Sequence, residues 1–326
     1  MRRREFITLL GGTIAWPCAA RAQKSLVRIG YLASGSSTSP IGIDRVAALK
    51  EGLRDNGLIE GRDYVLETRF AAGEYDHFPD LARELAQARV SIIVTNTIAS
   101  VRAAQKLSPP LPIVMVPIND PVGVGLVTSL ARPGGNTTGI ASLNEDLTPK
   151  LLEYQRMILP KARVLAALFN PSNPSNLRFL NDLGPRAGEM GMTILPIELK
   201  SPQGLDAAFS VIAAHRPDVL QVLADSGNID FSDRISALAL AQKLPSFSSI
   251  STYAEHGGLL SYGANAKKFY LRAGYYVKKI LDGANPGDLP VEQPTQIELW
   301  INLKTAKVLD LDIPMNLRQL ADQLIE

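Results

Sequence analysis

Short apolar runs alternate with helix-length amphipathic segments along nearly the whole chain, and this alternation starts twice. Such a pattern predicts parallel strands joined by helical crossovers, so we expect an α/β protein. We expect helices near 43–56, 78–88, 99–107 and 122–131 in the first series. Its predicted strands are VRIGYL (27–32), YVLETRF (64–70), SIIVTN (91–96), PIVMVP (112–117) and TTGIAS (137–142).

The second series of strands indicates a second lobe of similar size, and 326 residues suffice for two cores. Its strands are RVLAALF (163–169), MTILPIEL (192–199), VLQVLA (219–224) and SFSSIS (246–251). A strand near 257–263, a helix over 266–281, a strand within 294–303 and two terminal helices follow. We interpret this last part as a return to the first lobe and a second crossing back.

Residues 1–22 have the pattern of a secretory signal peptide. An arginine cluster precedes an apolar stretch over 6–16, and ARA at 20–22 is a small-x-small cleavage site. The RREFI motif at 3–7 resembles the twin-arginine export motif, and this route and the general secretory route both remain open. The stretch is about half of the roughly 20 residues that a membrane span needs. We therefore expect export to the periplasm, with cleavage after about Ala22.

Removal of this leader changes the charge of the chain. Four of its 34 Lys and Arg and one of its 32 Asp and Glu would be lost, so the net charge falls from +2 to −1. Such a charge favours neither nucleic acid nor an anionic membrane as a partner. The only cysteine, Cys18, is lost too, the three histidines are scattered, and no GxSxG or HExxH motif occurs. The sequence thus predicts no catalytic residues, no metal and no cofactor.

Polar loops follow the predicted strands of both series, at the place where open parallel sheets bind ligands. We expect two polar rims that face each other across a cleft, although the same serines, threonines and asparagines also suit helix N-caps. Asp120 and Asp225 directly follow apolar strands and could receive an ammonium group, or instead cap a helix or pair with an arginine. The candidate ligand-binding residues are Ser34, Ser36, Asn96, Thr97, Ser100, Asp120, Pro121, Asn170, Asp225, Ser226 and Ser248.

The glycine-rich segment DPVGVGLVTSLARPGGNTTG (120–139) is not predicted to bind phosphate. Thr128 stands where the dinucleotide fingerprint needs its third glycine, and the segment has no lysine of the P-loop type. We expect a pocket edge at 120–122, a helix over 122–131 and a turn at 133–135 into the last strand of the lobe.

Six segments of the chain, given at the end of this paragraph, carry a family likeness over residues 27–326. The chain resembles the ABC transporter substrate-binding proteins of the family that includes tryptophan- and tyrosine-binding members, related in shape to the type I periplasmic binding proteins. The segments are RIGYLASGS (28–36), FAAGEYD (70–76), DPVGVGLVTSLARPGGNTTGIASL (120–143), FNPSNPSN (169–176), EHGGLLSYG (255–263) and LPVEQPTQIELWINLKTAKVLDLDIP (289–314).

The resemblance implies two doubly wound, flavodoxin-like parallel-sheet lobes joined by a three-segment hinge. Lobe 1 would comprise 26–142 plus 257–283, and lobe 2 would comprise 143–256 plus 284–326. It implies a monomeric protein that is not an enzyme. Such a protein closes over a small molecule, an amino acid or a small carboxylate, and delivers it to the membrane permease subunits of an ABC importer.

By the same resemblance, Asn96, Thr97 and Ser100 would hold the ligand carboxylate, and Asp225 or Asp120 its ammonium group. The serine-rich SFSSISTY (246–253) departs from the family and argues against an aromatic ligand. A sensory protein that presents its ligand to a receptor and a secreted enzyme remain the alternatives.

Overall fold

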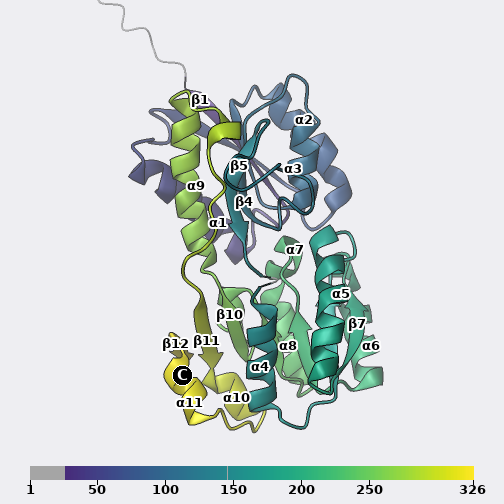
Figure 1. Cartoon of the computed structure of the whole chain (residues 1–326). Helices are drawn as coiled ribbons and strands as arrows, with labels where there is room; N and C mark the ends of the chain where they lie inside the picture. The colour runs from purple at the N-terminus through teal and green to yellow at the C-terminus, as the bar shows by residue number, and fades with distance from the viewer. Residues whose placement is uncertain (1–25, 145) are drawn as a thin grey trace, which may run out of the picture.

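The chain folds into two α/β lobes, which lie one above the other in Figure 1. The computed structural model describes residues 26–144 and 146–326. The expected signal peptide over 1–22 lies outside the described residues. Within the described ranges, no helix has the length and apolar character needed to cross a membrane.

The first lobe is built on a five-stranded sheet with the order β2-β1-β3-β4-β5, in which every pairing is parallel. Val27 lies opposite Tyr64 and Ile29 opposite Ile92, which sets the register around β1. The strands are β1 (Val27–Ala33), β2 (Tyr64–Phe70), β3 (Ile92–Thr95), β4 (Ile113–Asn119) and β5 (Thr137–Ser142). The crossovers carry α1 (Pro40–Asp55), η1 (Tyr75–His77), α2 (Phe78–Gln87) and α3 (Ile98–Gln105).

Helices cover both faces of this sheet, so its central strands are apolar on both sides. One face packs on α2 and α3 through residues such as Ile93 and Met115. The other packs on α1 and on α9 (Ala266–Leu281), a helix from late in the chain. The two helices touch closely because Gly52 and Gly274 lack side chains; a Cβ at Gly52 would lie 2.2 Å from the carbonyl oxygen of Leu271.

The second lobe has a seven-stranded sheet with the order β12-β11-β10-β9-β8-β6-β7. All its pairings are parallel except β10 with β11. The strands are β6 (Val164–Phe169), β7 (Thr193–Glu198), β8 (Val219–Val222), β9 (Ser246–Ser248), β10 (Leu260–Gly263), β11 (Glu298–Asn302) and the unexpected β12 (Gln323–Ile325). Its helices are α4 (Thr148–Ile158), α5 (Pro174–Glu189), η2 (Pro202–Gly204), α6 (Leu205–His215), α7 (Ser226–Ile229), α8 (Ser232–Ala241), η3 (Ser251–Tyr253), α10 (Leu303–Val308) and α11 (Met315–Leu320).

The crossings between the lobes differ from the boundaries expected at 257 and 284. β10 pairs with β9 and β11, which satisfies its backbone within the second sheet, so the chain enters the first lobe only after Gly263. It also leaves later than expected. The segment after α9, with η4 (Pro286–Asp288), still bonds to the first lobe, where the N–H of Ala141 donates to the carbonyl of Glu292.

The helix expected over 122–131 is absent, and residues 121–131 form turns and bends. Gly125 has a φ of 72°, a left-handed conformation that interrupts a right-handed helix. The hydroxyl of Thr128 donates to the carbonyls of Arg132 and Pro133, which folds the segment back on itself. The expected turn before β5 is present, since Gly134 and Gly135 both have positive φ.

Candidate functional site

The loops at the carboxyl ends of the strands from both sheets meet between the lobes and line a cavity of about 80 Å³. Half of its lining residues carry amide or hydroxyl side chains, including Asn96, Thr97, Asn119, Asn144, Asn173 and Ser175. A larger cavity of about 430 Å³ adjoins it, and the two share Arg45, Ile229, Ala266 and Tyr270 in their linings. The expected pair of facing polar rims therefore exists.

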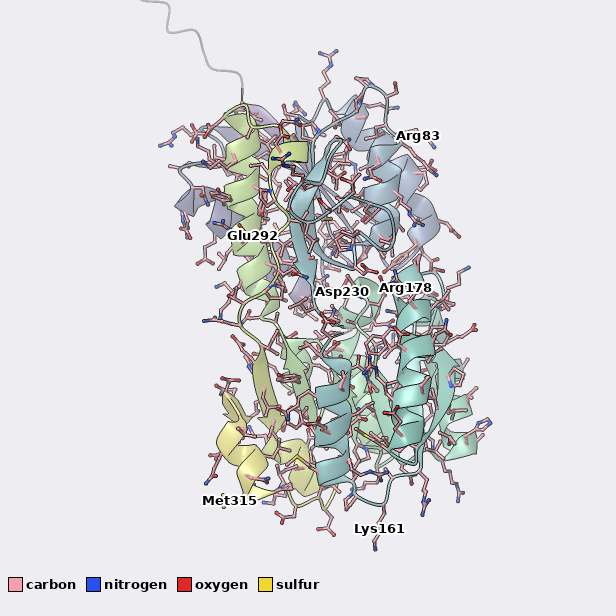
Figure 2. The ribbon with its side chains drawn as sticks, viewed as in Figure 1. Arg83, Lys161, Arg178, Asp230, Glu292 and Met315 are labelled. Atoms are coloured by element: carbon pink, nitrogen blue, oxygen red, sulfur yellow. The ribbon has the colours of Figure 1, made fainter. Side chains whose placement is uncertain are left out.

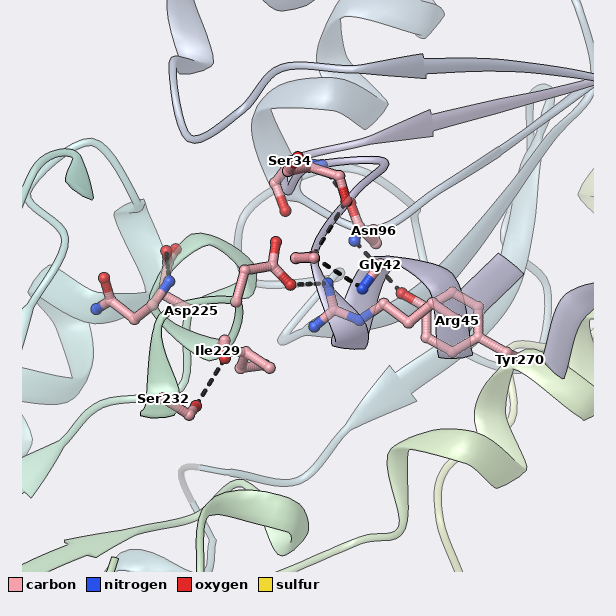
Figure 3. Close-up of polar contacts among 12 residues, drawn as sticks. Ser34, Gly42, Arg45, Asn96, Asp225, Ile229, Ser232 and Tyr270 are labelled. Atoms are coloured by element: carbon pink, nitrogen blue, oxygen red, sulfur yellow. Dashed lines mark hydrogen bonds and ion pairs between the residues drawn. The ribbon is translucent and has the colours of Figure 1, made fainter. Parts of the chain in front are cut away.

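The first-lobe wall includes the loop between β3 and α3. The Asn96 side-chain oxygen accepts from the N–H of Ser34 (3.2 Å), and its amide group donates to the Tyr270 hydroxyl (3.3 Å), as Figure 3 shows. Thr97 caps α3 in a reciprocal capping box with Ser100, so both hydroxyls bond within the helix end. Asn96 and Thr97 line the smaller cavity, whereas Ser100 lies behind them, fully buried.

The second-lobe wall is organised around Asp225, which is 3% exposed and follows β8. Oδ1 accepts from the Asn170 side chain (3.3 Å) and from the backbone N–H of Asn228 (3.2 Å). Oδ2 accepts from the Asn173 side chain (2.8 Å) and from the hydroxyl of Tyr75 (2.9 Å), a first-lobe residue. A carboxylate offers about four acceptor positions, and these four donors use them. Asn170 thus holds Asp225 in place.

A second buried carboxylate, Asp230, lies between the lobes in Figure 2. It accepts from Nη1 of Arg45 at 3.1 Å, and the two side chains are 0% and 8% exposed. Its other oxygen, Oδ2, has no hydrogen-bond partner among the described residues. Burial raises the pKa of Asp230 to about 6; Arg45 opposes this rise and the charge of Asp225 adds to it. A Cβ at Gly35 would lie 1.6 Å from Oδ2, so only glycine leaves room for this contact.

Asp120 lies away from both cavity linings and has a different role. Its side chain pairs with Arg178 of α5 (2.5 Å), which also joins the two lobes, and accepts from the N–H of Gly123. Pro121 beside it is buried, and neither residue lines either cavity. Of the roles predicted for Asp120, the structure therefore shows the pairing with an arginine.

The remaining expected residues are distributed around the cleft. Ser34 is fully buried, and its hydroxyl has no partner within the described part of the chain. Ser36 is half-buried and bonds to Thr38. Ser248 donates to the carbonyl of Val222 inside the second sheet. Ser226 begins α7, and its side chain lies outside what the structure describes.

Several cleft residues were missed by sequence reasoning: Arg45, Tyr75, Asn119, Asn173, Asp230 and Tyr270. Asn173 is also the N-cap of α5, and Tyr270 also packs in the core of the first lobe. Only these two roles leave a signal in the sequence. Arg45 sits one turn inside an amphipathic helix, and its partner Asp230 is 185 positions away.

Comparison with known proteins places this geometry in a family. A family model described as ABC transporter substrate binding protein matches residues 40–325. A relative named tyrosine-binding protein, from Clostridioides difficile (strain R20291), is 26% identical over 262 residues, which cover 80% of this chain and 75% of the relative.

Two solved structures share the fold over most of the chain. A conserved domain protein from Vibrio cholerae O1 biovar El Tor has a TM-score of 0.84 and 24% identity, covering 91% of this chain and 99% of that one. An ABC domain from Streptococcus pneumoniae, in complex with L-Trp, has a TM-score of 0.83 and 22% identity, covering 92% and 100%. These similarities confirm the two-lobed type I periplasmic binding protein fold. Since the family model spans most of its length, the chain belongs to the ABC transporter substrate binding protein family.

Proposed function

We propose that this protein is the solute-binding component of an ABC importer, which captures an amino acid or small carboxylate between its lobes and delivers it to a membrane permease. The observation that carries the proposal is the cavity between the lobes, whose lining includes hydrogen-bonding groups from both lobes. The relative named for tyrosine and the neighbour in complex with L-Trp support an amino acid as the ligand.

Closure of the lobes is the expected working motion. Several contacts join one lobe to the other, including the hydroxyl of Tyr75 with Asp225, Arg45 with Asp230, and the hydroxyl of Ser175 with the carbonyl of Asn119 (3.4 Å). Separation of the lobes would break all of them. A ligand held by both walls binds the closed form better than the open form and so shifts the population toward closure.

We assign the ligand contacts from the two walls of the smaller cavity. Asn96 and the start of α3 at Thr97 would face the ligand carboxylate, because a helix N-terminus favours negative charge. Asp225 would face the ammonium group from the second lobe. Ser34, whose hydroxyl has no partner among the described residues, lines neither cavity and supports the wall through its N–H, which donates to Asn96. Ser100 and Asn170 act by fixing Thr97 and Asp225.

Export places the protein where an importer needs it. We propose that the leader is cleaved after about Ala22 and that the mature chain works in the periplasm as a monomer. Cell fractionation, N-terminal mass determination and analytical ultracentrifugation test these three statements. A chain that keeps residues 1–22, remains in the cytoplasm or sediments as a dimer contradicts the corresponding one.

The binding function is tested by isothermal titration calorimetry after a thermal-shift screen of amino acids and small carboxylates. A bound solute raises the melting temperature, and mass spectrometry should recover it chemically unchanged. Recovery of a converted product would instead indicate an enzyme. Loss of uptake of that solute in a deletion strain supports transport, whereas unchanged uptake with a lost transcriptional response indicates the sensory alternative.

A further inference from the structure

Arg45 is a buried cation of the cleft that has unused donors. It lies on α1 in the first lobe, its side chain is 8% exposed, and it lines both cavities. A guanidinium has five N–H donors, yet within the described residues Arg45 makes one hydrogen bond, from Nη1 to Asp230. A buried charge is costly unless its hydrogen bonds are made. The other donors of Arg45 therefore need an acceptor that the described residues do not supply.

The charges of the smaller cavity match a zwitterion. Among the described residues of its lining, Arg45 is the single cation and Asp225 the single carboxylate. They come from opposite lobes, Arg45 from α1 and Asp225 from the loop between β8 and α7. Figure 3 shows Asp225 on one side of the lobe interface and Arg45 on the other. An α-amino acid has one negative and one positive group, and this lining offers each an opposite charge.

Arg45 also adjoins the residues assigned above to the ligand carboxylate. Its Cζ lies 5.9 Å from the centre of the Tyr270 ring, and the Tyr270 hydroxyl accepts from Asn96 at 3.3 Å. All three side chains line the smaller cavity together with Thr97 at the start of α3. Tyr270 thus holds an amide and a guanidinium on one wall, as Figure 3 shows. An arginine binds a carboxylate through charge-assisted N–H bonds, which are stronger than bonds from neutral donors.

We propose that Arg45 is a ligand contact, which donates to the carboxylate of the bound solute through the N–H groups that Asp230 does not use. This inference rests on the proposed solute-binding function and names the residue that selects its solute. The cleft then requires a free carboxylate and discriminates against amides and esters of the same skeleton. Because Asp230 belongs to the second lobe, one guanidinium connects the ligand carboxylate to the closed form.

The first arm of the test compares acids with their amides. Calorimetry of the purified mature protein uses L-tyrosine, L-tryptophan, L-leucine and any acid that the wider screen identifies, each beside its carboxamide. We expect the acid to bind about 100-fold more tightly than its carboxamide, because the carboxamide has no negative charge to pair with the guanidinium. A carboxamide that binds as tightly as its acid overturns the inference and leaves the solute-binding function intact.

The second arm separates a ligand contact from support of the closed form. Asp230→Asn keeps Arg45 and should keep the ratio of acid affinity to amide affinity. Arg45→Met/Asp230→Asn should lower that ratio about tenfold, because weaker closure affects acid and amide equally and cancels in the ratio. Arg178→Met is the matched control, since Arg178 also joins the lobes but lines neither cavity. This control should leave the ratio unchanged.

The possible outcomes decide between the two roles of Arg45. An equal ratio in Asp230→Asn and in the double variant, or an equal fall in Arg178→Met, would limit Arg45 to closure and overturn the contact. If the double variant does not fold, Arg45→Lys replaces it, and the ratio should fall about threefold because lysine keeps the charge without the planar fork. If no acid of the set or of the wider screen binds, the proposed function fails together with the inference.

Discussion

Two buried carboxylates at the ends of α7 have opposite relations to the lobes. Asp225 accepts from four neutral donors, and three of these, Asn170, Asn173 and Asn228, belong to its own lobe. Among the described residues, Asp230 has one partner, a guanidinium from the other lobe, and one oxygen without a hydrogen bond. Asp225 is thus stabilised largely by its own lobe, whereas Asp230 depends on closure for its only described partner.

The difference indicates how one loop can both bind the ligand and make closure of the lobes sensitive to charge. A carboxylate fixed by its own lobe presents a prearranged surface to the ligand before closure, which lowers the ordering cost of binding. A carboxylate paired only across the cleft instead makes closure sensitive to charge. When the lobes separate, water solvates Arg45 and Asp230, and on closure both must lose that water.

The largest expected effect comes from Arg45→Met. This change would leave Asp230 buried beside an apolar side chain in the closed form, so ligand affinity should fall by about 3–5 kcal/mol, the typical penalty for breaking a buried ion pair. Calorimetry with the identified solute measures the loss. The double variant Arg45→Met/Asp230→Asn should recover part of it, and a double variant no better than the single one would refute the role of this pair.

Asp225→Ala should have the next largest effect, and it should act on the lobe as well as on the ligand. Affinity should fall by about 2–5 kcal/mol if Asp225 meets a buried ammonium group. The ligand-free protein should also melt at a lower temperature, because three amide or backbone donors of the second lobe lose their acceptor. Unchanged affinity would remove Asp225 from the ligand contacts, and an unchanged melting temperature would contradict its role within the lobe.

Regular structure was predictable where burial on both sheet faces leaves a strong sequence pattern. The bounds of β5, whose residues are all buried, agree with the expected range, and the largely buried β1 extends only one residue further. The half-buried edge strand β2 also has the expected bounds. The prediction of a helix over 122–131 was wrong, because the hydrogen bonds of local turns and the left-handed Gly125 override an apolar pattern. β12 was missed because a strand of three residues has too short a pattern to separate from a helix end.

The cleft itself was only half predictable, for a physical reason. Polar residues after strands, such as Asn96 and Asp225, follow from the topology of parallel sheets. The contact of Arg45 with Asp230 depends on how two separately folded lobes sit against each other, which no local pattern encodes. The hydroxyls of Thr97 and Ser100 are ambiguous in a different way. A residue that caps a helix and a residue that contacts a ligand leave the same pattern in the sequence, and these two hydroxyls cap α3.

Gly35→Ala tests the Asp230 contact by shape without changing any charge. The added methyl would overlap Oδ2 of Asp230 in the closed form, so ligand affinity should fall by about 1–3 kcal/mol, as in other overpacked sites. Gly184→Ala in α5 is the matched control, because a Cβ there meets no atom within 4 Å. Equal affinities for the two variants would mean that the lobes close without bringing Asp230 against Gly35.

The smallest expected effect is a pH dependence of closure. Burial raises the pKa of Asp230 from its ordinary 3.8 to about 6 in the closed form, with Arg45 opposing and Asp225 assisting, so closure takes up a proton between these values. A raised pKa stabilises the closed form fully below about pH 4, and this contribution is lost as the pH rises through 6. Closure should therefore be favoured on the order of tenfold more at pH 4.5 than at pH 7.5.

The lobe distance of the ligand-free protein measures this dependence directly. Gln87→Cys on α2 and Ala207→Cys on α6 place one fluorescent label on an exposed position of each lobe, and the described residues contain no other cysteine to compete. Energy transfer should rise as the pH falls from 7.5 to 4.5, and Asp230→Asn should abolish the change. Asp233→Asn, which removes the exposed partner of His256, should keep it. A pH response that survives Asp230→Asn would assign the proton to another group and leave Asp230 as a pH-independent contact.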